Sequence, residues 1–474
     1  MYQRATNPIG KYSAIGMRRF GDFVISRWQR TFCQQSLTFL CGVTLIVITV
    51  CSVQAQEKTP ASLEQSNVAK LQSQPQSQTP LPKRSITLAE AVEIFLRQNL
   101  QLVAGRYDIE TADAEKLTAR LRPNPQLTFG LSDVPVNLRG PVVKEGTYSY
   151  GISHTIELGG KRSKRIDVAD ANSDVARGQF QMTVWQLTND LKRKFYTVVL
   201  NQSLLNLAKD NQATFEEIVK HTTELVNAGE ISGLDLERVE VEKLKFDTDL
   251  ANSERDYEVA LRDLRFVLGG DYRTMDIEVS GTIDYEPYQF SFTELRDKAL
   301  AERPDLKAAQ LTERAADANI RLQNAQRIPD LTVGGGIDQA PSGTSTYTAG
   351  VGIALPLSDR NQGERAKALI AKKQAENQTQ LITNQVLSDV DKAIVAFEMQ
   401  RRRVDLYRSG VVTKVNDIQR LTEVALRAGE SSTLELLDAI RTRRDTLSAF
   451  YQTLFDYQMS LLDLELATAT PLHK

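Results

Sequence analysis

Apolar residues alternate with small or polar residues between positions 347 and 357 of this chain. A two-residue period of this kind is typical of a β-strand with one apolar face. After the junction Asp359-Arg360-Asn361-Gln362-Gly363 the apolar spacing becomes helical, and no proline interrupts it as far as Arg427. The pattern therefore predicts a strand at about 346–357 that leads almost directly into one very long helix.

The same pattern occurs once earlier in the chain. Residues 148–158 alternate in the same way, the junction Gly159-Gly160-Lys161-Arg162 follows, and helical spacing then continues to Asn227. The two expected long helices, 161–227 and 361–427, have 67 residues each, which corresponds to about 100 Å at about 1.5 Å per residue. Helices of this length exceed what a globular core requires, and they indicate a rod or a tube.

Three short stretches align in the same order between the two halves of the chain, which indicates an internal duplication. They pair 125–130 with 329–334, 148–158 with 347–357, and 228–230 with 428–430. Each unit is predicted to consist of an unbroken helix (87–121 or 292–326), two strands, a long helix and a closing helix. The expected organisation is a signal peptide at 1–55, a leader at 56–85, a first unit at 86–268 with strands at about 125–132 and 147–158, a linker at 269–289, a second unit at 290–468 with strands at about 330–338 and 346–357, and a C-terminal tail at 469–474.

The N-terminal segment predicts export from the cytoplasm. A basic region precedes an apolar run at 37–50, and Val53-Gln54-Ala55 offers small residues for cleavage, as in a secretory signal peptide. Two alternatives stay open: the run anchors the chain as a membrane helix, or Cys51 carries a lipid. Translation from Met17 is also compatible with the pattern. Residues 56–85 are rich in Gln, Ser and Pro, which predicts a disordered leader.

The composition argues against several classes of partner and site. The formal net charge is −2 and the pI about 6.1, so no basic excess points to a nucleic-acid partner. All three cysteines lie in the predicted signal peptide, so a chain cleaved after Ala55 would have no disulfide and no thiolate ligand. His154, His221 and His473 are far apart in the sequence, so no metal or cofactor site is predicted. No nucleophile–base arrangement stands out, and we expect no enzymatic activity.

The four predicted strands alternate apolar residues with small or uncharged polar ones. This is the pattern of membrane-spanning β-barrel strands, which face lipid on one side and a water-filled lumen on the other. A small soluble sheet is the alternative. Four strands are too few to close a barrel, since the smallest barrels have about eight. We therefore expect several copies of the chain to contribute strands to one barrel.

The junctions resemble those of the TolC superfamily of outer-membrane efflux proteins. Residues 157–162 and 355–363 look like the strand-to-helix junctions of the heavy-metal efflux branch, the cobalt–zinc–cadmium type, and the likeness extends from about Ile86 to Ala467. The resemblance implies a mostly α-helical homotrimer with a twelve-stranded outer-membrane β-barrel and a periplasmic α-barrel, in a Gram-negative bacterium. It also implies a passive exit duct for heavy-metal cations that contacts outer-membrane lipid, a periplasmic adaptor and an inner-membrane resistance–nodulation–division pump. Drug efflux and type I secretion are alternatives, and a structural periplasmic coiled-coil or adaptor protein is an alternative from another class.

Three groups of residues are candidate functional positions. The strand-to-helix junctions are expected to need unusual backbone conformations, at Gly159, Gly160, Lys161, Asp359, Arg360, Asn361 and Gly363. The turns after the long helices are expected to be left-handed caps, and the resemblance makes them periplasmic tips that dock the adaptor, at Gly229, Glu230, Gly429 and Glu430.

The third group is an acidic pair just after the second of these turns. Glu435 and Asp438 match, by the same resemblance, acidic residues that ring the closed periplasmic entrance, and they lie three positions apart on one helical face. For Glu435 a helix-capping role is the alternative, because Ser432-Thr433-Leu434-Glu435 has capping-box spacing.

Overall fold

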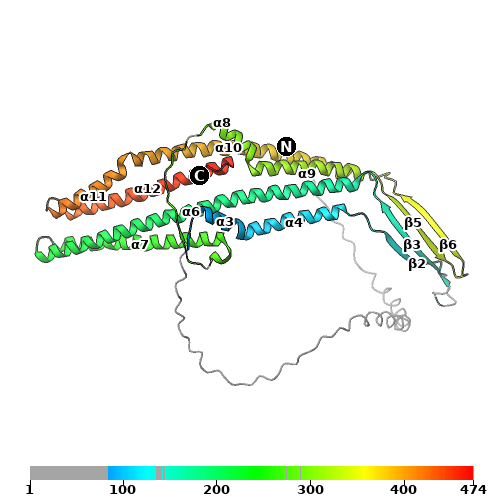
Figure 1. The fold of residues 1–474 in the computed structure, drawn as a ribbon, viewed down its shortest axis with the longest axis horizontal. Coiled ribbons are helices and arrows are strands. Elements are labelled where there is room, and N and C mark those ends of the chain that lie inside the picture. The colour runs from blue at the N-terminus through cyan, green and yellow to red at the C-terminus, as the bar shows by residue number, and fades with distance from the viewer. Residues whose placement is uncertain (1–83, 135–140, 142–144, 274, 289, 473–474) are drawn as a thin grey trace, which may run out of the picture. The chain divides into compact units, whose positions relative to one another are not determined.

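The computed structural model describes residues 84–134, 141, 145–273, 275–288 and 290–472, so the expected signal peptide and almost all of the leader lie outside the described residues. The first half of the described chain is shown in blue to green in Figure 1 and contains β1 (Arg84–Ile86), α3 (Leu88–Gln98), α4 (Leu100–Arg120), β2 (Gln126–Ser132), β3 (Thr147–Ile156), α6 (Lys161–Ala228) and α7 (Gly233–Leu268). A short 3-10 turn (Gly270–Arg273) and β4 (Ile277–Val279) lead to the second half, which contains α8 (Phe292–Glu302), α9 (Pro304–Gln326), β5 (Leu331–Gln339), β6 (Ser345–Ile353), α10 (Gln362–Leu406), a π-turn (Tyr407–Val411), α11 (Val412–Arg427) and α12 (Thr433–Thr468).

The described chain is mostly helical, as the sequence predicts, and α6 alone has 68 residues. The expectation of unbroken opening helices is wrong in both units. In the first unit the helix stops at Asn99, whose side-chain oxygen accepts hydrogen bonds from the amides of Gln101 (2.9 Å) and Leu102 (3.2 Å) and so caps a new helix. In the second unit Pro304 starts a new helix, because its fixed φ suits the first helical position.

The second long helix is also interrupted, contrary to the expectation of one helix at 361–427. A π-turn separates α10 from α11, and inside it Gly410 has φ of 116° and ψ of 2°, outside the helical region. The sequence contains no proline here, and the single glycine is the signal that was missed.

Four strands form one antiparallel sheet in the order β2-β3-β5-β6. The strands lie within a few residues of their expected positions, although β6 ends at Ile353, before Leu355 and Leu357. The register places rows of residues side by side across the sheet, for example Phe129, Tyr150, Ile337 and Tyr347. Because the side-chain period is two, the sheet has one apolar face and one face of small and polar residues.

The helices lie in layers whose order matches that of the strands. α4 and α7 pack on α6, α6 packs on α9 and α12, and α10 packs on α9 and α12 (Figure 1). α4 and α7 are therefore the outermost helices on one side of the described chain, and α10 and α11 are outermost on the other. None of the helices in the described ranges is long and apolar enough to cross a membrane.

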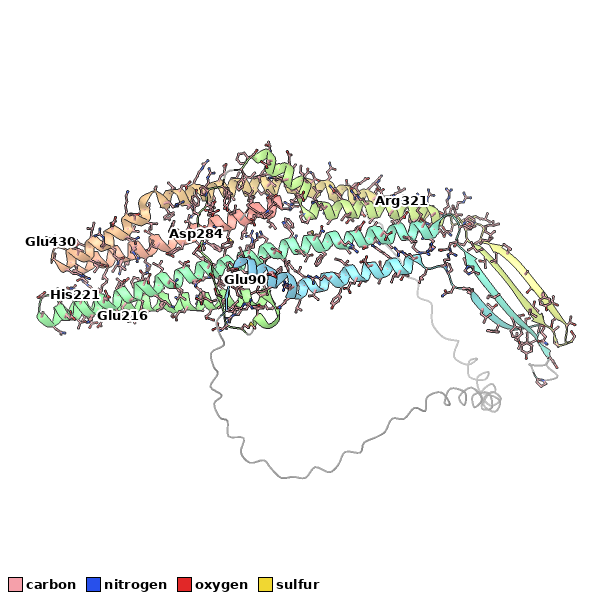
Figure 2. All side chains as sticks on the ribbon, viewed as in Figure 1. Glu90, Glu216, His221, Asp284, Arg321 and Glu430 are labelled. Carbon is pink, nitrogen blue, oxygen red and sulfur yellow. The ribbon has the colours of Figure 1, made fainter. Side chains whose placement is uncertain are left out.

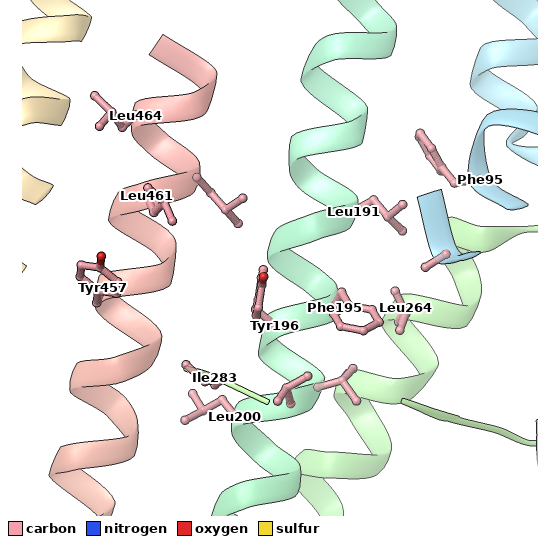
Figure 3. Close-up of a cluster of buried hydrophobic side chains, with 14 of the residues drawn as sticks. Phe95, Leu191, Phe195, Tyr196, Leu200, Leu264, Ile283, Tyr457, Leu461 and Leu464 are labelled. Carbon is pink, nitrogen blue, oxygen red and sulfur yellow. The ribbon is translucent and has the colours of Figure 1, made fainter. Parts of the chain in front are cut away.

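The main apolar core lies where α3, α6, α7, α10 and α12 pass one another. Figure 3 shows Phe195 of α6 beside Leu264 of α7, with Tyr457 of α12 on the opposite side of α6; all three side chains are at most 2% exposed. A second, smaller core joins α6, α7 and α12 closer to the turns that connect α6 with α7 and α11 with α12. It consists of Phe215, Ile218, Val239, Phe246, Leu436, Leu437 and Ile440.

The segment between the two units is more structured than the expected linker at 269–289. Strand β4 pairs in parallel with β1, so Arg84 and Ser85, which the sequence places in the leader, belong to a short two-stranded sheet. The chain then crosses the helices, and the hydroxyl of Tyr457 donates a 2.5 Å hydrogen bond to the backbone oxygen of Glu286. We call residues 280–288 the strap, because Asp284 and Glu286 within it accept hydrogen bonds from α12 across this core.

Candidate functional site

The first strand-to-helix junction is built on two left-handed glycines. Gly159 and Gly160 have φ of 70° and 69°, a region that L-residues rarely adopt. A Cβ on Gly159 would lie 2.7 Å from Cδ1 of Ile328, so both space and conformation require glycine there. Next to them, Nζ of Lys161 donates to Oδ1 of Asp330 at 2.7 Å, which ties the start of α6 to the start of β5.

The second junction has an asparagine, not a glycine, in the left-handed conformation before its helix. Asn361 has φ of 59° and takes the place before the helix that Gly160 takes in the first unit. Its side-chain nitrogen donates to the backbone oxygen of Gln323 at 2.9 Å, and Oδ1 of Asp359 accepts from its amide at 2.9 Å. Arg360 also contacts the turn, because its Nε donates to the backbone oxygen of Pro356 at 3.3 Å.

Gly363 does not have the conformational role that the sequence suggested. It is the second residue of α10, its φ is not positive, and a Cβ built on it would meet nothing within 4 Å. The need for a special backbone conformation falls on Asn361 instead, because asparagine tolerates the left-handed region better than most residues.

The apolar face of the sheet is exposed in the protomer. Its rows contain Leu127, Phe129, Tyr150, Ile152, Tyr347 and Val351, each between 46% and 81% exposed. The opposite face carries Gly, Ser and Thr at almost every position, and Asp338 is its one ionisable residue within the paired strands that the structure describes. An apolar surface of this size is unfavourable in water and calls for lipid or protein to cover it.

The turns at the ends of the two hairpins, α6–α7 and α11–α12, have the same geometry. Gly229 and Gly429 both have φ of 77°. The amide of Glu230 donates to the backbone oxygen of Leu225 at 3.0 Å, and that of Glu430 donates to the backbone oxygen of Ala425 at 2.8 Å. Both glutamates are exposed, and Figure 2 shows Glu430 at the far end of its hairpin. These contacts satisfy the last carbonyls of each long helix and leave the acidic side chains at the surface.

Glu435 forms the capping box that the sequence offered as its alternative role. Oε2 of Glu435 accepts from Oγ of Ser431 at 2.6 Å and from the amide of Ser432 at 3.0 Å, while Oγ of Ser432 accepts from the amide of Glu435 at 3.3 Å. The hydroxyl of Ser431 and the amide of Ser432 lower the pKa of the Glu435 carboxyl. Asp438 is exposed one turn further along α12. Within one protomer, hydrogen bonds of the capping box therefore fix the Glu435 carboxylate, whereas Asp438 is exposed on the surface of α12.

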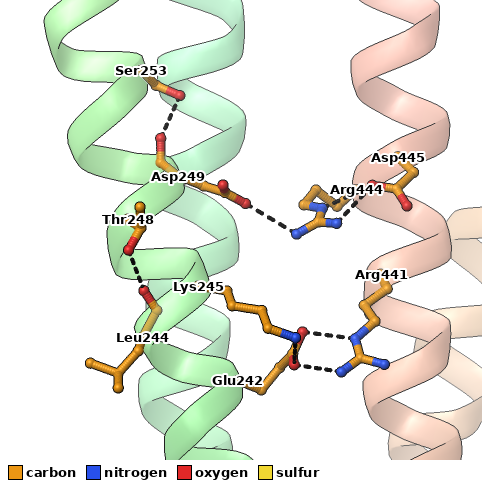
Figure 4. A network of polar contacts seen from close by, with 9 residues as sticks. All are labelled: Glu242, Leu244, Lys245, Thr248, Asp249, Ser253, Arg441, Arg444 and Asp445. Atoms are coloured by element: carbon orange, nitrogen blue, oxygen red, sulfur yellow. Dashed lines mark hydrogen bonds and ion pairs between the residues drawn. The ribbon is translucent and has the colours of Figure 1, made fainter.

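A cluster of ion pairs that the sequence did not reveal joins the two hairpins just above the tips (Figure 4). The guanidinium of Arg441 on α12 donates to Glu242 on α7 through Nε at 2.7 Å and NH2 at 2.5 Å, and Nζ of Lys245 donates to the same carboxylate at 2.9 Å. One turn on, Arg444 contacts Asp249 at 3.1 Å and lies 5.1 Å from the centre of the Phe246 ring. We call the Glu242–Arg441 pair the hairpin clamp.

The hairpin clamp is electrostatically strong because its acid is buried. The Glu242 side chain is only 6% exposed, whereas that of Arg441 is 38% exposed. The hydrogen bonds from Arg441 are the largest influence on Glu242 and lower the pKa of its carboxyl to about 2, against the opposing effect of burial. Glu242 and Arg441 are 199 positions apart in the sequence, and no local sequence pattern predicts their contact.

Among the residues that the structure describes, no group of three or more His, Cys, Asp or Glu side chains is arranged to hold a metal ion.

The family profile described as "Outer membrane efflux protein" matches residues 91–270 and 295–470. The chain belongs to this family. It is thus an outer-membrane efflux channel with a periplasmic part, and the two matched blocks coincide with the two helix–strand units separated by the strap. The sequence resemblance to the TolC superfamily is confirmed, and membership of a channel family indicates no catalytic activity.

Individual proteins are also similar to this chain, although their sequence identity to it is low. The chain is 24% identical over 358 residues to the cobalt-zinc-cadmium resistance protein CzcC of Cupriavidus metallidurans, which covers 75% of this chain and 84% of CzcC. It is 23% identical to the cation efflux system protein CusC of Escherichia coli, over 70% of this chain and 75% of CusC. The crystal structure of the Campylobacter jejuni CmeC outer membrane channel has a similar fold, with a TM-score of 0.69 and 15% identity, and the match covers 89% of this chain and 95% of CmeC.

Proposed function

We propose that this efflux channel works as a homotrimer whose strands close one twelve-stranded barrel in the outer membrane. The observation that carries the proposal is the open sheet of the protomer. Its edge strands β2 and β6 are exposed at every residue and pair on one side only, and its apolar face has no cover. An open sheet cannot span a membrane because its edges would leave backbone groups unpaired, so closure with further copies is required.

The outermost helices support the same arrangement. α4 and α7 expose Leu100, Tyr107, Leu117, Val241, Leu244 and Phe266, each at least 58% exposed. On the other side α10 and α11 expose Ile370, Leu381, Val395, Leu406, Leu421 and Val424, each at least 57% exposed. Two different apolar sides on one protomer suit head-to-tail contacts, which close into a ring. In such a ring the helices would continue the barrel as a periplasmic α-barrel.

The proposed cargo is heavy-metal cations. The names of CzcC and CusC refer to cobalt, zinc and cadmium resistance and to cation efflux, and the residues at 355–363 resemble that branch of the family. Deletion of the gene should sensitise the cell to cobalt, zinc or cadmium. Unchanged metal tolerance together with raised drug sensitivity would instead assign the channel to drug efflux, and loss of an exported protein would assign it to type I secretion.

The proposed partners are a periplasmic adaptor and an inner-membrane resistance–nodulation–division pump, which would supply the energy. The turns with Gly229, Glu230, Gly429 and Glu430 would dock the adaptor, because they present exposed carboxylates on rigid caps. Reversal of both charges, Glu230→Lys with Glu430→Lys, should weaken adaptor binding in a pull-down. Equal binding of the wild type and this double variant would contradict the assignment.

Asp438 and Glu435 are proposed to line the periplasmic entrance. Three copies of Asp438 around a narrow opening would attract cations and repel anions. Glu435 is partly committed to its capping box, so we expect Asp438 to contribute more of the charge. Replacement of both by alanine should lower the cation preference that reversal potentials in a salt gradient measure. An unchanged reversal potential would place both residues outside the pore.

The channel itself is tested with purified protein in a planar lipid bilayer. We expect discrete conductance steps and a trimer in outer-membrane fractions. A protein that stays soluble without detergent and gives no conductance steps would refute the proposal and favour a structural periplasmic protein.

A further inference from the structure

The four places where a helix meets the sheet are rich in arginine. The chain crosses between helix and sheet at 121–125, 157–160, 327–330 and 354–361, where the helix ends and the strands meet in Figure 1. Hydrogen bonds tie these crossings together, since Nε of Arg162 donates to the backbone oxygen of Arg120 at 2.7 Å and Nζ of Lys161 donates to Asp330. We call the five arginines in or next to the crossings the arginine collar: Arg120, Arg122, Arg162, Arg327 and Arg360.

The positive charge of the arginine collar is not compensated within the chain. The carboxylates next to the crossings have other partners: Asp330 pairs with Lys161, Glu157 with Arg165, and Glu364 with Lys367. Oδ1 of Asp359 accepts a 2.9 Å hydrogen bond from the amide of Asn361. Within the ranges that the structure describes, none of the five collar arginines forms an ion pair, and all except the half-buried Arg162 are exposed. The collar is therefore open to an anion from outside the chain.

The electrostatics of the helix ends do not explain the whole collar. Arg120 and Arg327 lie at the C-terminal ends of α4 and α9, where the helix dipole favours a cation. Arg162 and Arg360 lie at the N-terminal ends of α6 and α10, where the dipole disfavours a cation, and the first turn of α6 contains no acidic residue. Arginine at both kinds of helix end therefore indicates an anion that the chain itself does not supply.

Exposed apolar side chains stand beside the collar arginines in the sequence. Leu121 lies between Arg120 and Arg122 and is 65% exposed, and Ile328 directly follows Arg327 and is 40% exposed. Before Arg360 the crossing carries two more exposed apolar side chains, those of Leu355 and Leu357. Apolar side chains next to arginines suit the boundary between hydrocarbon and headgroups, because an arginine lays its aliphatic stem on apolar surface and keeps its guanidinium in the polar layer.

The length of the strands places the collar at the level of the headgroups. Strand β3 has 10 residues, and a strand of that length with a tilt of about 40° rises about 25 Å, which is the height of the apolar band of an outer-membrane barrel. On the helical side the apolar face ends in the row Ile156, Leu331 and Ile353. Arg327 precedes Leu331 by four positions, so about 13 Å of chain at most separates them. The headgroup layer is about 6 Å thick on each side of the hydrocarbon, so it begins where the collar begins.

The opposite end of the sheet has no excess of positive charge. Residues 340–344, between β5 and β6, contain no charged residue, and the sequence at 133–146 contains two acidic and two basic residues. The basic excess is therefore confined to the end that joins the helices. Because the helices form the periplasmic part of this channel family, the collar lies on the side of the periplasmic leaflet.

We propose that the arginine collar binds the headgroups of anionic phospholipids, such as phosphatidylglycerol, in the periplasmic leaflet of the outer membrane. Guanidinium groups donate charge-assisted hydrogen bonds to phosphate oxygens, and each arginine close to an anionic lipid surface favours that surface about fivefold. The collar thus fixes the height of the channel, with the apolar face of the sheet in the hydrocarbon and the guanidinium groups at the phosphates. The proposal rests on the proposed function, because it requires the sheet to lie in the membrane as part of a closed barrel.

The test measures which lipids the full-length protein retains from vesicles of about four parts phosphatidylethanolamine to one part phosphatidylglycerol. After extraction in a mild detergent, mass spectrometry gives the ratio of the two lipids that stay bound to the protein. The wild type should retain phosphatidylglycerol with at least about threefold enrichment over the vesicle composition. Enrichment should fall when the salt in the extraction buffer rises from about 0.05 M to about 0.5 M, because the screening length shrinks from about 14 Å to about 4 Å.

Three sets of variants separate the charge of the collar from other effects. The collar variant combines Arg122→Gln, Arg327→Gln and Arg360→Gln, and it should lose the enrichment. The matched control combines Arg262→Gln, Arg402→Gln and Arg427→Gln, which removes the same charge from exposed positions on α7, α10 and α11 and should keep the enrichment. Lysine at the three collar positions preserves the charge and should retain most of the enrichment.

The outcomes distinguish the collar from the barrel. Equal enrichment by the collar variant and the matched control would overturn the proposal, as would a lysine variant that loses as much as the glutamine variant. A wild type that floats with the vesicles but shows no enrichment would overturn the collar alone, whereas a wild type that does not insert would refute the barrel and the collar with it. If the triple glutamine variant does not insert, Arg327→Gln alone should lower the enrichment by about a third, and unchanged enrichment would overturn the proposal.

Discussion

The hairpin clamp offers the sharpest test of the physical argument. Glu242 and Arg441 join α7 and α12 across the gap between the two hairpins, and a double-mutant cycle isolates their interaction. The single variants are Glu242→Gln and Arg441→Gln, which remove one charge each while they keep most of the side-chain volume. The cycle then compares both single variants with the double variant and the wild type.

The magnitude follows from the geometry. Lowering of the Glu242 pKa from 4.5 to about 2 corresponds to about 3 kcal/mol of preference for the charged carboxylate. Lys245 shares this effect, but its side chain is 61% exposed, and an exposed partner contributes about 0.5 kcal/mol. Arg441 makes the two short bonds, so we expect a coupling energy of about 2 kcal/mol between Glu242 and Arg441.

Amide hydrogen exchange is the suitable assay, because it measures local opening without complete unfolding of a membrane protein. Protection in the ranges 239–249 and 436–447 should fall in each single variant by about 1–3 kcal/mol, and the double variant should lose little more than either. Asp235→Asn with Arg238→Gln is the matched control. That pair lies on one helix at 3.5 Å, with side chains 39% and 60% exposed, and should couple by less than about 0.5 kcal/mol.

The outcome that refutes the reasoning is a coupling energy equal to that of the control pair. Such a result would mean that solvent reaches Glu242 or that the two hairpins do not keep this contact in the assembled protein. A coupling near 2 kcal/mol in the proposed trimer would show that the hairpins stay joined when the copies associate.

Further outcomes follow from the same contacts. The Glu242 pKa is lowered, so the contribution of the clamp is complete above about pH 4.5 and declines as the pH falls toward about 2; thermal unfolding between about pH 5 and pH 2.5 should therefore lose more stability in wild type than in Glu242→Gln. Gly159→Ala should destabilise by about 2 kcal/mol, because φ is 70° and its Cβ would meet Ile328 at 2.7 Å. Gly363→Ala should be neutral or stabilise by about 0.5 kcal/mol in the same thermal measurement, and a loss as large as that of Gly159→Ala would contradict the assignment of the left-handed position to Asn361. Glu435→Ala should lower the thermal stability through loss of the capping box, and no change in stability would count against that role.

The sequence predicts the parts of this fold that depend on local periodicity. The alternation at 148–158 and 347–357 locates two strands, and the helical spacing that follows locates two rods. The glycine pair at 159–160 predicts the first junction because a left-handed conformation strongly prefers glycine. The second junction is harder, because Asn361 and Gly363 are both plausible and only the backbone shows which one carries the positive φ.

Features that depend on distant contacts could not be predicted. Glu242 and Arg441 each look like ordinary surface residues of a charged helix, and only the packing of α7 beside α12 turns them into a pair. The sequence predicts a plain linker at 269–289, because three-residue strands such as β4 carry too little pattern to be recognised. The break at Pro304 is different, because proline at the first position of a helix is a start signal that is visible in the sequence.

The two units of the duplication have diverged at the positions that bend and join the hairpins. Counted from the tip glycines, Gly410 stands where the first unit has Asp210, and Arg441 stands where it has Val241, which is 58% exposed. The first unit thus keeps an uninterrupted helix and an apolar surface residue, while the second has a broken helix and a charge directed at its neighbour. If duplication produced two equivalent helical hairpins, these substitutions have since made the two hairpins structurally different. The two hairpins are therefore not interchangeable, because the contact between them needs an arginine that only the second unit has at this position.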